Sequence, residues 1–121
     1  MTPTLAIELP GIGDPESLVA RRRELPPPRP GQAVVRMEAT GVSFAEQQMR
    51  RGKYYDQPPF PFVPGYDLVG TVDAVGPGTP GVTVGDRVAA VTKTGAWAER
   101  VLVDADDLVP VPEGLDAVAA E

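Results

Sequence analysis

Apolar and polar residues alternate most regularly over residues 32–40. Val35, Met37 and Ala39 fall on one side of this segment, and the residues between them are charged or polar. Side chains on an extended strand point alternately to its two faces. The alternation therefore predicts a strand with one buried and one exposed face.

Shorter apolar segments bounded by glycine or proline predict six further strands, at residues 5–9, 18–25, 68–75, 87–91, 96–103 and 108–111. Residues 68–75 are apolar nearly throughout, which indicates a strand buried on both faces. In the segment 18–25, the run Arg21-Arg22-Arg23 predicts a solvated edge, where charge discourages aggregation. A patch for an anionic ligand is the alternative.

One short helix is predicted after the strand at 32–40. Ser43 stands at a capping position and Glu46 follows three residues later, which is a capping-box pattern. The helix would run from Phe44 to Arg51 and end at Gly52. Residues 57–64 contain four prolines and are predicted to form an ordered loop. A second helical stretch begins at residue 115.

The pattern as a whole predicts a mainly β protein, a barrel or sandwich of short strands with one or two short helices. The chain of 121 residues is long enough for one domain with a modest core. No internal repeat is visible. We therefore expect residues 1–121 to form a single domain.

The net charge of −6 arises from 17 acidic and 11 basic residues. A general nucleic-acid binder needs a basic surface, so this balance argues against nucleic acid as a partner. No apolar run reaches the length of about 18 residues that a membrane span needs, and no signal peptide is recognisable. A cytoplasmic location without membrane association is the resulting expectation.

The chain contains no cysteine and no histidine. Disulfides, thiolate nucleophiles, the usual general base and the commonest ligands of transition metals are therefore excluded. Asp104, Asp106 and Asp107 lie close together but lack the glycine and the distal glutamate of a calcium loop. They are predicted to form a solvated turn, and no metal site is expected.

Four glycine-containing motifs carry a family resemblance: Gly41-Val42-Ser43-Phe44-Ala45-Glu46, Gly52-Lys53-Tyr54, Gly65-Tyr66-Asp67 and Gly85-Asp86-Arg87-Val88. In this order and spacing, they resemble the N-terminal, GroES-like domain of the medium-chain dehydrogenases/reductases. The zinc-independent quinone oxidoreductases are the most similar group. The resemblance implies a GroES-like, partly open β-barrel.

The resemblance also bears on zinc. Zinc alcohol dehydrogenases of this superfamily have a cysteine where this chain has Ser43 and a histidine where it has Tyr66. Their structural zinc lobe needs four cysteines, and this chain has none. Hydroxyl groups that keep their protons are poor zinc ligands. A zinc-free domain is therefore expected.

The resemblance implies roles for particular residues. Ser43 replaces the asparagine of quinone oxidoreductases, and with Tyr54 it would lie near the nicotinamide and the substrate as a catalytic residue. Ser43, Glu46 and Gln48 are the expected cofactor contacts. The expected substrate pocket contains Tyr54, Tyr66, Phe60 and Phe62. In the alternative interpretation Glu46 only caps a helix, Tyr54 packs over the proline-rich loop, and Tyr66 fills the space of the lost metal.

The implied activity is NADPH-dependent, zinc-free reduction of a small molecule such as a quinone or an enone. A Rossmann domain and its Gly-x-Gly-x-x-Gly motif are missing, since the glycines over 76–81 precede no helix. Alone, the chain is expected to bind NADPH weakly or not at all and to be inactive. Its expected partners are the missing domain or a second copy of itself. The rival hypothesis is a stand-alone binding or assembly module.

Overall fold

The computed structural model describes residues 2–112 and 114–120. The predicted helix at the C-terminal end is compared only as far as residue 120, because residue 121 lies outside the described residues. The elements are β1 (Thr2–Glu8), the 3-10 helix η1 (Pro15–Ser17), β2 (Val19–Leu25), β3 (Gln32–Ala39), α1 (Phe44–Arg50), β4 (Asp67–Val75), β5 (Arg87–Val91), β6 (Arg100–Asp104), the 3-10 helix η2 (Ala105–Asp107), β7 (Val109–Pro110) and α2 (Ala117–Ala120).

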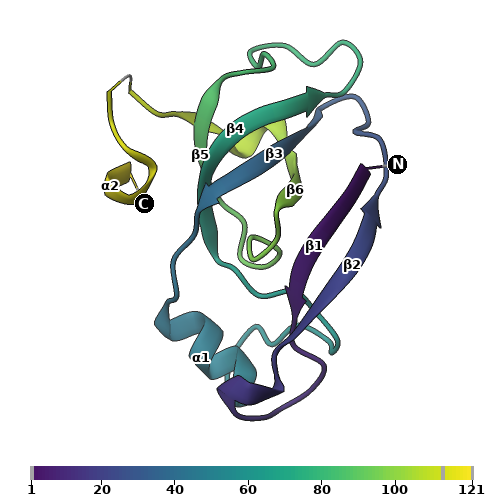
Figure 1. Ribbon diagram of the computed structural model, residues 1–121, viewed down its shortest axis with the longest axis vertical. Helices are drawn as coiled ribbons and strands as arrows, with labels where there is room; N and C mark the ends of the chain where they lie inside the picture. Colours follow the sequence, from purple (N-terminus) through teal and green to yellow (C-terminus); the bar gives the residue numbers. More distant parts are fainter. Residues whose placement is uncertain (1, 113, 121) are drawn as a thin grey trace.

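Most strands belong to one antiparallel sheet with the order β6-β3-β4-β5-β7, while β1 and β2 pair separately. Figure 1 shows the larger sheet in the upper part of the molecule, with the β1–β2 pair beside it and α1 below. The sheets remain open and do not close into a complete barrel. The mainly β, GroES-like fold predicted from the sequence is confirmed.

The core occupies one face of the larger sheet. It collects alternate side chains from β3 and their neighbours on β4, β5 and β6, among them Ala33, Val35, Leu68, Val72, Val88, Val101 and Val103. Ala33 and Val35 of β3 belong to the alternating pattern that predicted that strand. Val34 points to the opposite face but is only 2% exposed. Strand β3 is therefore more enclosed than its alternation indicated.

Strands β3 and β4 approach each other closely at Gly70. A Cβ atom at this position would overlap the carbonyl oxygen of Arg36. The pairing of the two strands also shifts register just beyond this point, between Met37 and Ala39. A glycine inside the strand therefore permits a backbone approach that any side chain would block.

Strand β2 forms an exposed edge, as its charged residues predict. Every residue of β2 is exposed except Leu25, which is half-buried. Arg21 makes an ion pair with Glu8 of β1, with 2.9 Å between Nε and Oε1. An edge lined with arginines is a poor template for pairing with another chain.

The strand predicted over residues 96–103 is wrong in its first half, because β6 begins at Arg100. The N–H groups of Ala96 and Trp97 donate to the carbonyls of Gly65 and Pro64, at 3.3 and 3.0 Å. Ala98 then forms an isolated bridge with Ala6 of β1. This segment crosses two other elements before it joins the sheet, which local alternation could not reveal.

Helix α1 confirms the predicted helix but lacks the predicted capping box. Ser43 occupies the N-cap position in an extended conformation, yet its side chain bonds no helix N–H group. Its hydroxyl donates to the Glu46 carboxylate instead. Gly52, at φ +71°, follows the helix end as predicted.

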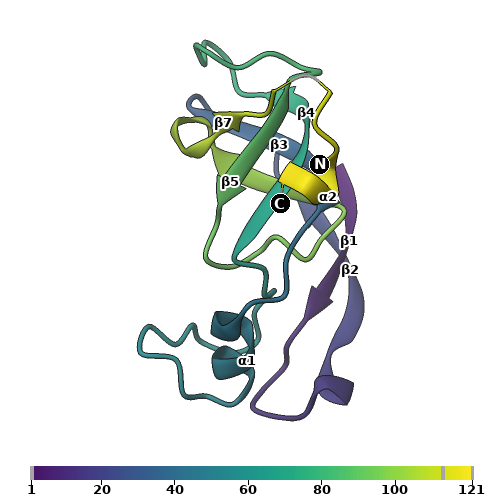
Figure 2. The same cartoon turned by 90° about the vertical axis from the view of Figure 1, so that its left-hand side faces the viewer.

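The segment between β7 and α2 is fastened to the sheet by Arg87. Its Nη1 donates to the carbonyl of Leu115 at 2.5 Å, and its Nη2 lies 3.7 Å from a Glu38 carboxylate oxygen. Helix α2 then lies against β3 and β4, in front of the sheet in Figure 2. The helices in the described parts of the chain, seven and four residues long, are too short to cross a membrane.

Candidate functional site

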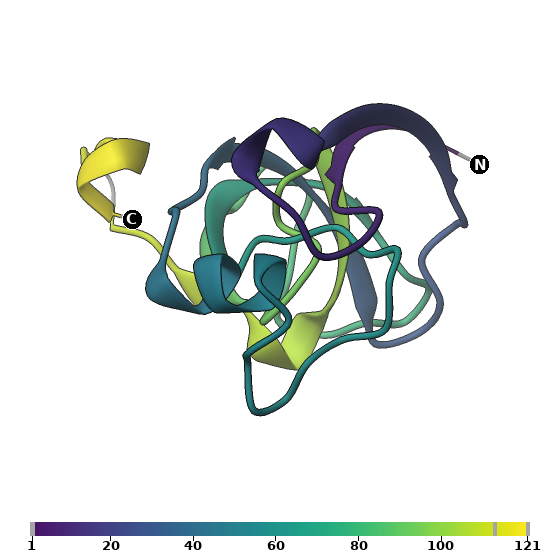
Figure 3. The same cartoon turned by 90° about the horizontal axis from the view of Figure 1, so that it is seen from below.

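Two segments that carry predicted site residues meet below the larger sheet, where α1 and its adjoining loops lie (Figure 3). They are the segment before α1 and the loop that leads into β4. Thr40 Oγ1 donates to the carbonyl of Asp67 at 2.6 Å, and the Gly41 N–H reaches Asp67 Oδ1 at 3.4 Å. Trp97 Nε1 donates to the Gly41 carbonyl at 3.1 Å. These bonds hold the motif that begins at Gly41 beside the loop that leads into β4.

Backbone contacts fix the position of Tyr66. The preceding Gly65 has φ +119°, and its carbonyl accepts a hydrogen bond from Thr92 Oγ1 at 2.7 Å. The Tyr66 carbonyl accepts from the N–H groups of Thr92 and Lys93, at 2.6 and 3.0 Å. A Cβ atom on Gly65 would lie 2.5 Å from the backbone nitrogen of Trp97. Only glycine fits this turn, and the turn determines where Tyr66 lies.

Ser43, Glu46 and Tyr66 are linked through one carboxylate. The Ser43 hydroxyl donates to Glu46 Oε2, and the Tyr66 N–H donates to Glu46 Oε1 at 3.4 Å. Glu46 is only 3% exposed, whereas Ser43 and Tyr66 are half-buried. The structure therefore brings these three predicted residues together, with Glu46 beneath the surface.

Tyr54 lies in the loop after α1, where its ring packs on Tyr55 with 4.8 Å between centroids. The hydrogen bond with the Tyr55 side chain raises the pKa of Tyr54, and desolvation and the nearby Tyr55, Tyr66 and Asp56 raise it further. The effect of Tyr66 on the pKa of Tyr54 is one of the smaller causes. A phenol is protonated at neutral pH with or without this shift, so the Tyr54 hydroxyl can donate a hydrogen bond.

Replacement of Tyr55 by phenylalanine is expected to lower the pKa of Tyr54 toward its ordinary value of 10.0, because the largest cause of the shift is removed. NMR titration of ring-labelled tyrosines would measure each phenol separately. Tyr66→Phe serves as the matched control and should change the Tyr54 pKa less. A Tyr54 pKa that stays the same or rises in Tyr55→Phe would contradict this account.

Phe60 and Phe62 pack on each other, with their ring centroids 5.5 Å apart, and both are half-buried. The backbone of Phe62 pairs with Leu9, through N–H to carbonyl bonds of 2.8 and 3.2 Å. This pairing fastens the proline-rich loop to the chain just after β1. The assignment of both phenylalanines to the substrate pocket remains a prediction.

Gln48 lies on α1 and is half-buried. Its side-chain oxygen is buried and has no hydrogen-bond partner among residues 2–112 and 114–120. The main-chain carbonyl of the same residue accepts from the Lys53 N–H at 2.8 Å. The amide oxygen is an acceptor without a protein donor, and the predicted cofactor contact of Gln48 stays a prediction.

An apolar hollow of about 300 Å³ beside Glu46 was not predicted from the sequence. Its walls include Leu9, Val42, Pro64 and Trp97. Trp97 packs against the core and also forms part of this wall. Trp97 can be found in the sequence, but nothing in the order of residues indicates that it lines the same hollow as Leu9.

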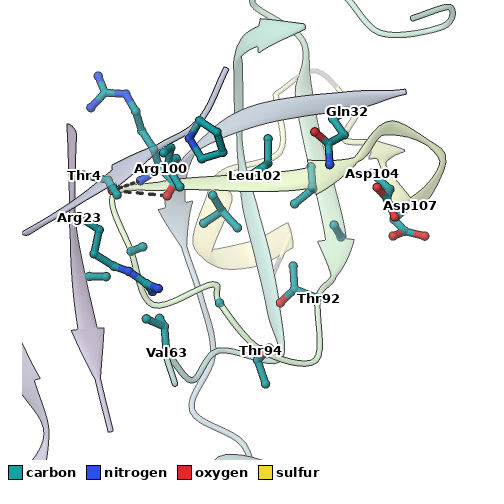
Figure 4. A pocket seen from close by; sticks show the side chains of 18 of the residues that line it. Thr4, Arg23, Gln32, Val63, Thr92, Thr94, Arg100, Leu102, Asp104 and Asp107 are labelled. Atoms are coloured by element: carbon teal, nitrogen blue, oxygen red, sulfur yellow. Dashed lines mark hydrogen bonds between the residues drawn. The ribbon is translucent and has the colours of Figure 1, made fainter. Parts of the chain in front are cut away.

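A second cavity, of about 470 Å³, lies along the unpaired edge of β6 (Figure 4). Arg23 points into it from β2, with Thr92 and Thr94 on another side. The backbone N–H of Arg100, on this edge, donates a hydrogen bond to Thr4 Oγ1 at 3.0 Å. One backbone donor of the unpaired edge therefore has a side-chain partner. None of the predicted site residues lines this cavity.

In the described parts of the chain, no three acidic side chains gather in a way that could hold a metal ion. Asp104, Asp106 and Asp107 lie exposed in and beside η2, as the predicted solvated turn requires.

Comparison with known proteins agrees with this fold. The family model "Alcohol dehydrogenase GroES-like domain" matches residues 29–113. The human synaptic vesicle membrane protein VAT-1 homolog is 38% identical over 109 residues, covering 88% of this chain and 28% of that protein. The rat quinone oxidoreductase is 34% identical over 113 residues, covering 92% of this chain and 34% of that protein.

A solved structure of mycobacterial Rv1454c complexed with NADPH superposes with a TM-score of 0.83 at 37% identity, covering 97% of this chain and 35% of the other. The chain belongs to the alcohol dehydrogenase GroES-like domain family, the N-terminal domain of medium-chain dehydrogenases/reductases. Within that class it is quinone oxidoreductase-like. It spans only about a third of the length of these relatives.

Proposed function

We propose that this chain is the substrate-side domain of an NADPH-dependent, zinc-free oxidoreductase that reduces quinones, enones or related activated carbonyl and alkene compounds. The observation that carries the proposal is that Ser43 and the Tyr66 N–H meet on the buried carboxylate of Glu46. Tyr54 lies in the loop that follows α1, the helix that contains Glu46. The similarity to quinone oxidoreductases and to an NADPH-bound relative supports the choice of reaction.

The residues of this chain suit only the nicotinamide end of the cofactor. Strand β4 is followed by turns over residues 76–81 and then by β5, so these glycines precede no helix that could bind a pyrophosphate. Ser43 would contact the nicotinamide. Bound NADPH would supply the hydride.

Hydride addition to a quinone or enone leaves negative charge on the substrate oxygen, and a protein donor must stabilise it. We assign this role to Tyr54, whose phenol is protonated at neutral pH and can donate a hydrogen bond. The half-buried Tyr66, Phe60 and Phe62 would provide aromatic walls for a flat substrate. Reduction by hydride transfer needs no zinc when a hydroxyl takes the place of the metal as the electrophilic group.

The proposal can be tested by joining residues 1–120 to the part of mycobacterial Rv1454c that follows its matching segment. This fusion is expected to oxidise NADPH in the presence of a quinone. The 121-residue chain alone is expected to show no turnover, because it lacks a site for most of the cofactor. Absorbance of NADPH measures both reactions.

The matched control is a fusion that carries Tyr54→Phe, which keeps the fold but loses the proposed donor. A folded fusion that binds NADPH but reduces no quinone or enone would contradict the oxidoreductase assignment and favour a binding or assembly module. Robust turnover by the isolated chain would contradict the assignment to one half of a site.

A further inference from the structure

We propose that Glu46 is a positioning residue that fixes the hydrogen-bond polarity of Ser43, so that Ser43 offers only an acceptor to a bound molecule. The group that Ser43 binds is then a donor, namely the carboxamide N–H of a nicotinamide. The developing negative charge on the substrate falls to Tyr54 alone. This inference rests on the proposed function. It makes Ser43 an acceptor and Tyr54 a donor, whereas the family resemblance describes both simply as catalytic residues.

The burial of Glu46 is the first observation. Its side chain is 3% exposed, beside the apolar hollow lined by Leu9, Pro64 and Trp97. It makes no ion pair among the residues that the structure describes. A carboxylate so placed needs hydrogen-bond donors. Its partners in the structure are the Ser43 hydroxyl and the Tyr66 N–H, and its side chain also forms part of the wall of the hollow.

The second observation is that both partners of Glu46 are donors. A backbone N–H, here that of Tyr66, can only donate. The Ser43 hydroxyl has a single proton, and it donates that proton to the other carboxylate oxygen. Because this proton is donated to Glu46, Ser43 keeps only its oxygen lone pairs for a bound molecule. An oxygen with no free proton cannot stabilise a forming oxyanion.

The isosteric substitution Glu46→Gln would reverse this polarity. The Tyr66 N–H needs an acceptor and would take the glutamine Oε1, which turns the glutamine Nε2 toward Ser43. The Nε2 group can only donate, so Ser43 would have to accept and its own proton would become free. One substitution with nearly unchanged shape therefore converts Ser43 from an acceptor into a donor.

NMR of the 121-residue chain tests the hydrogen bonds without any activity. The Ser43 hydroxyl proton should be protected from exchange in the wild type and should exchange rapidly in Glu46→Gln. The Tyr66 amide resonance should move in Glu46→Ala but stay close to its wild-type position in Glu46→Gln. Glu16→Gln, the same change at an exposed residue, should alter neither signal.

The functional arm uses the fusion with two cofactors, NADPH and its reduced 3-acetylpyridine analogue, whose acetyl group has no N–H donor. The wild-type fusion should have a KM about fivefold lower for NADPH than for the analogue, the value of one ordinary hydrogen bond. Ser43→Ala should remove this preference, and Ser43→Thr, which keeps a hydroxyl, should restore it. Glu46→Gln should also remove the preference, because a Ser43 that donates can bind the carbonyl oxygen that both cofactors have.

The outcomes separate the two proposals. A protected Ser43 hydroxyl with an inactive fusion would support the role of Glu46 and contradict the proposed reaction. An active fusion in which Glu46→Gln leaves both the hydroxyl exchange and the cofactor preference unchanged would overturn the role of Glu46. Equal losses of stability when Glu46→Gln is added to the wild type and to the Ser43→Ala variant would also overturn it, since a merely structural residue acts independently of Ser43.

Discussion

Gly65→Ala is expected to destabilise the domain by about 3 kcal/mol or more, combining backbone strain with a steric clash. The residue has φ +119°, and an added Cβ would lie 2.5 Å from the backbone nitrogen of Trp97. That nitrogen donates to the carbonyl of Pro64, so it cannot move away without breaking a hydrogen bond. Chemical denaturation of both proteins would measure the difference.

The matched control is Gly85→Ala, where φ is +99° but no atom lies near the added Cβ. This variant should show only the backbone strain, about 1–2 kcal/mol. Because the Gly65 turn also places Tyr66, Gly65→Ala should shift the Tyr66 amide signal, and Gly85→Ala should not. Equal losses of stability in the two variants would show that the contact with Trp97 contributes nothing.

Tyr54→Phe in the fusion is expected to lower kcat about 100-fold, because the variant loses the donor for the oxygen that gains charge. The KM for NADPH should change little, since the phenol acts mainly in the transition state. Steady-state kinetics with a quinone would measure both constants. An unchanged kcat would return Tyr54 to the alternative role of a packing aromatic in the loop.

Tyr55→Phe is the control for this variant, because it removes a phenolic hydroxyl from the adjacent residue, which is 92% exposed. At neutral pH, Tyr54 is protonated whether or not Tyr55 raises its pKa. The control should therefore keep most of the turnover. A loss as large as that of Tyr54→Phe would assign the donor to the pair of tyrosines and not to Tyr54.

Local sequence patterns predicted several elements well. Strand β5 has the predicted bounds, and β3 and α1 each end one residue before theirs. Their signals are local, since alternation, a glycine stop and a capping-type serine are all read within about ten residues. The start of β6 was missed because Trp97 and Ala98 bond to segments far away in the sequence.

The candidate site shows the same division. The motifs named Ser43, Tyr54 and Tyr66, and the structure brings Ser43 and Tyr66 together on Glu46. From the sequence, Glu46 could be assigned only a local capping role or a cofactor contact, because the capping box was its only visible partner. The hydrogen bond from the Tyr66 N–H and the burial of Glu46 depend on how the loop before β4 folds over α1.

The residue types and their short-range order are enough to establish the mainly β class, the family, and the lack of cysteine and histidine chemistry. These properties can be read without knowing which segments meet in space. Only the folded chain shows that the buried Glu46 carboxylate links Ser43 to Tyr66. Burial and hydrogen-bond direction arise when distant segments pack together, so a linear pattern does not contain them.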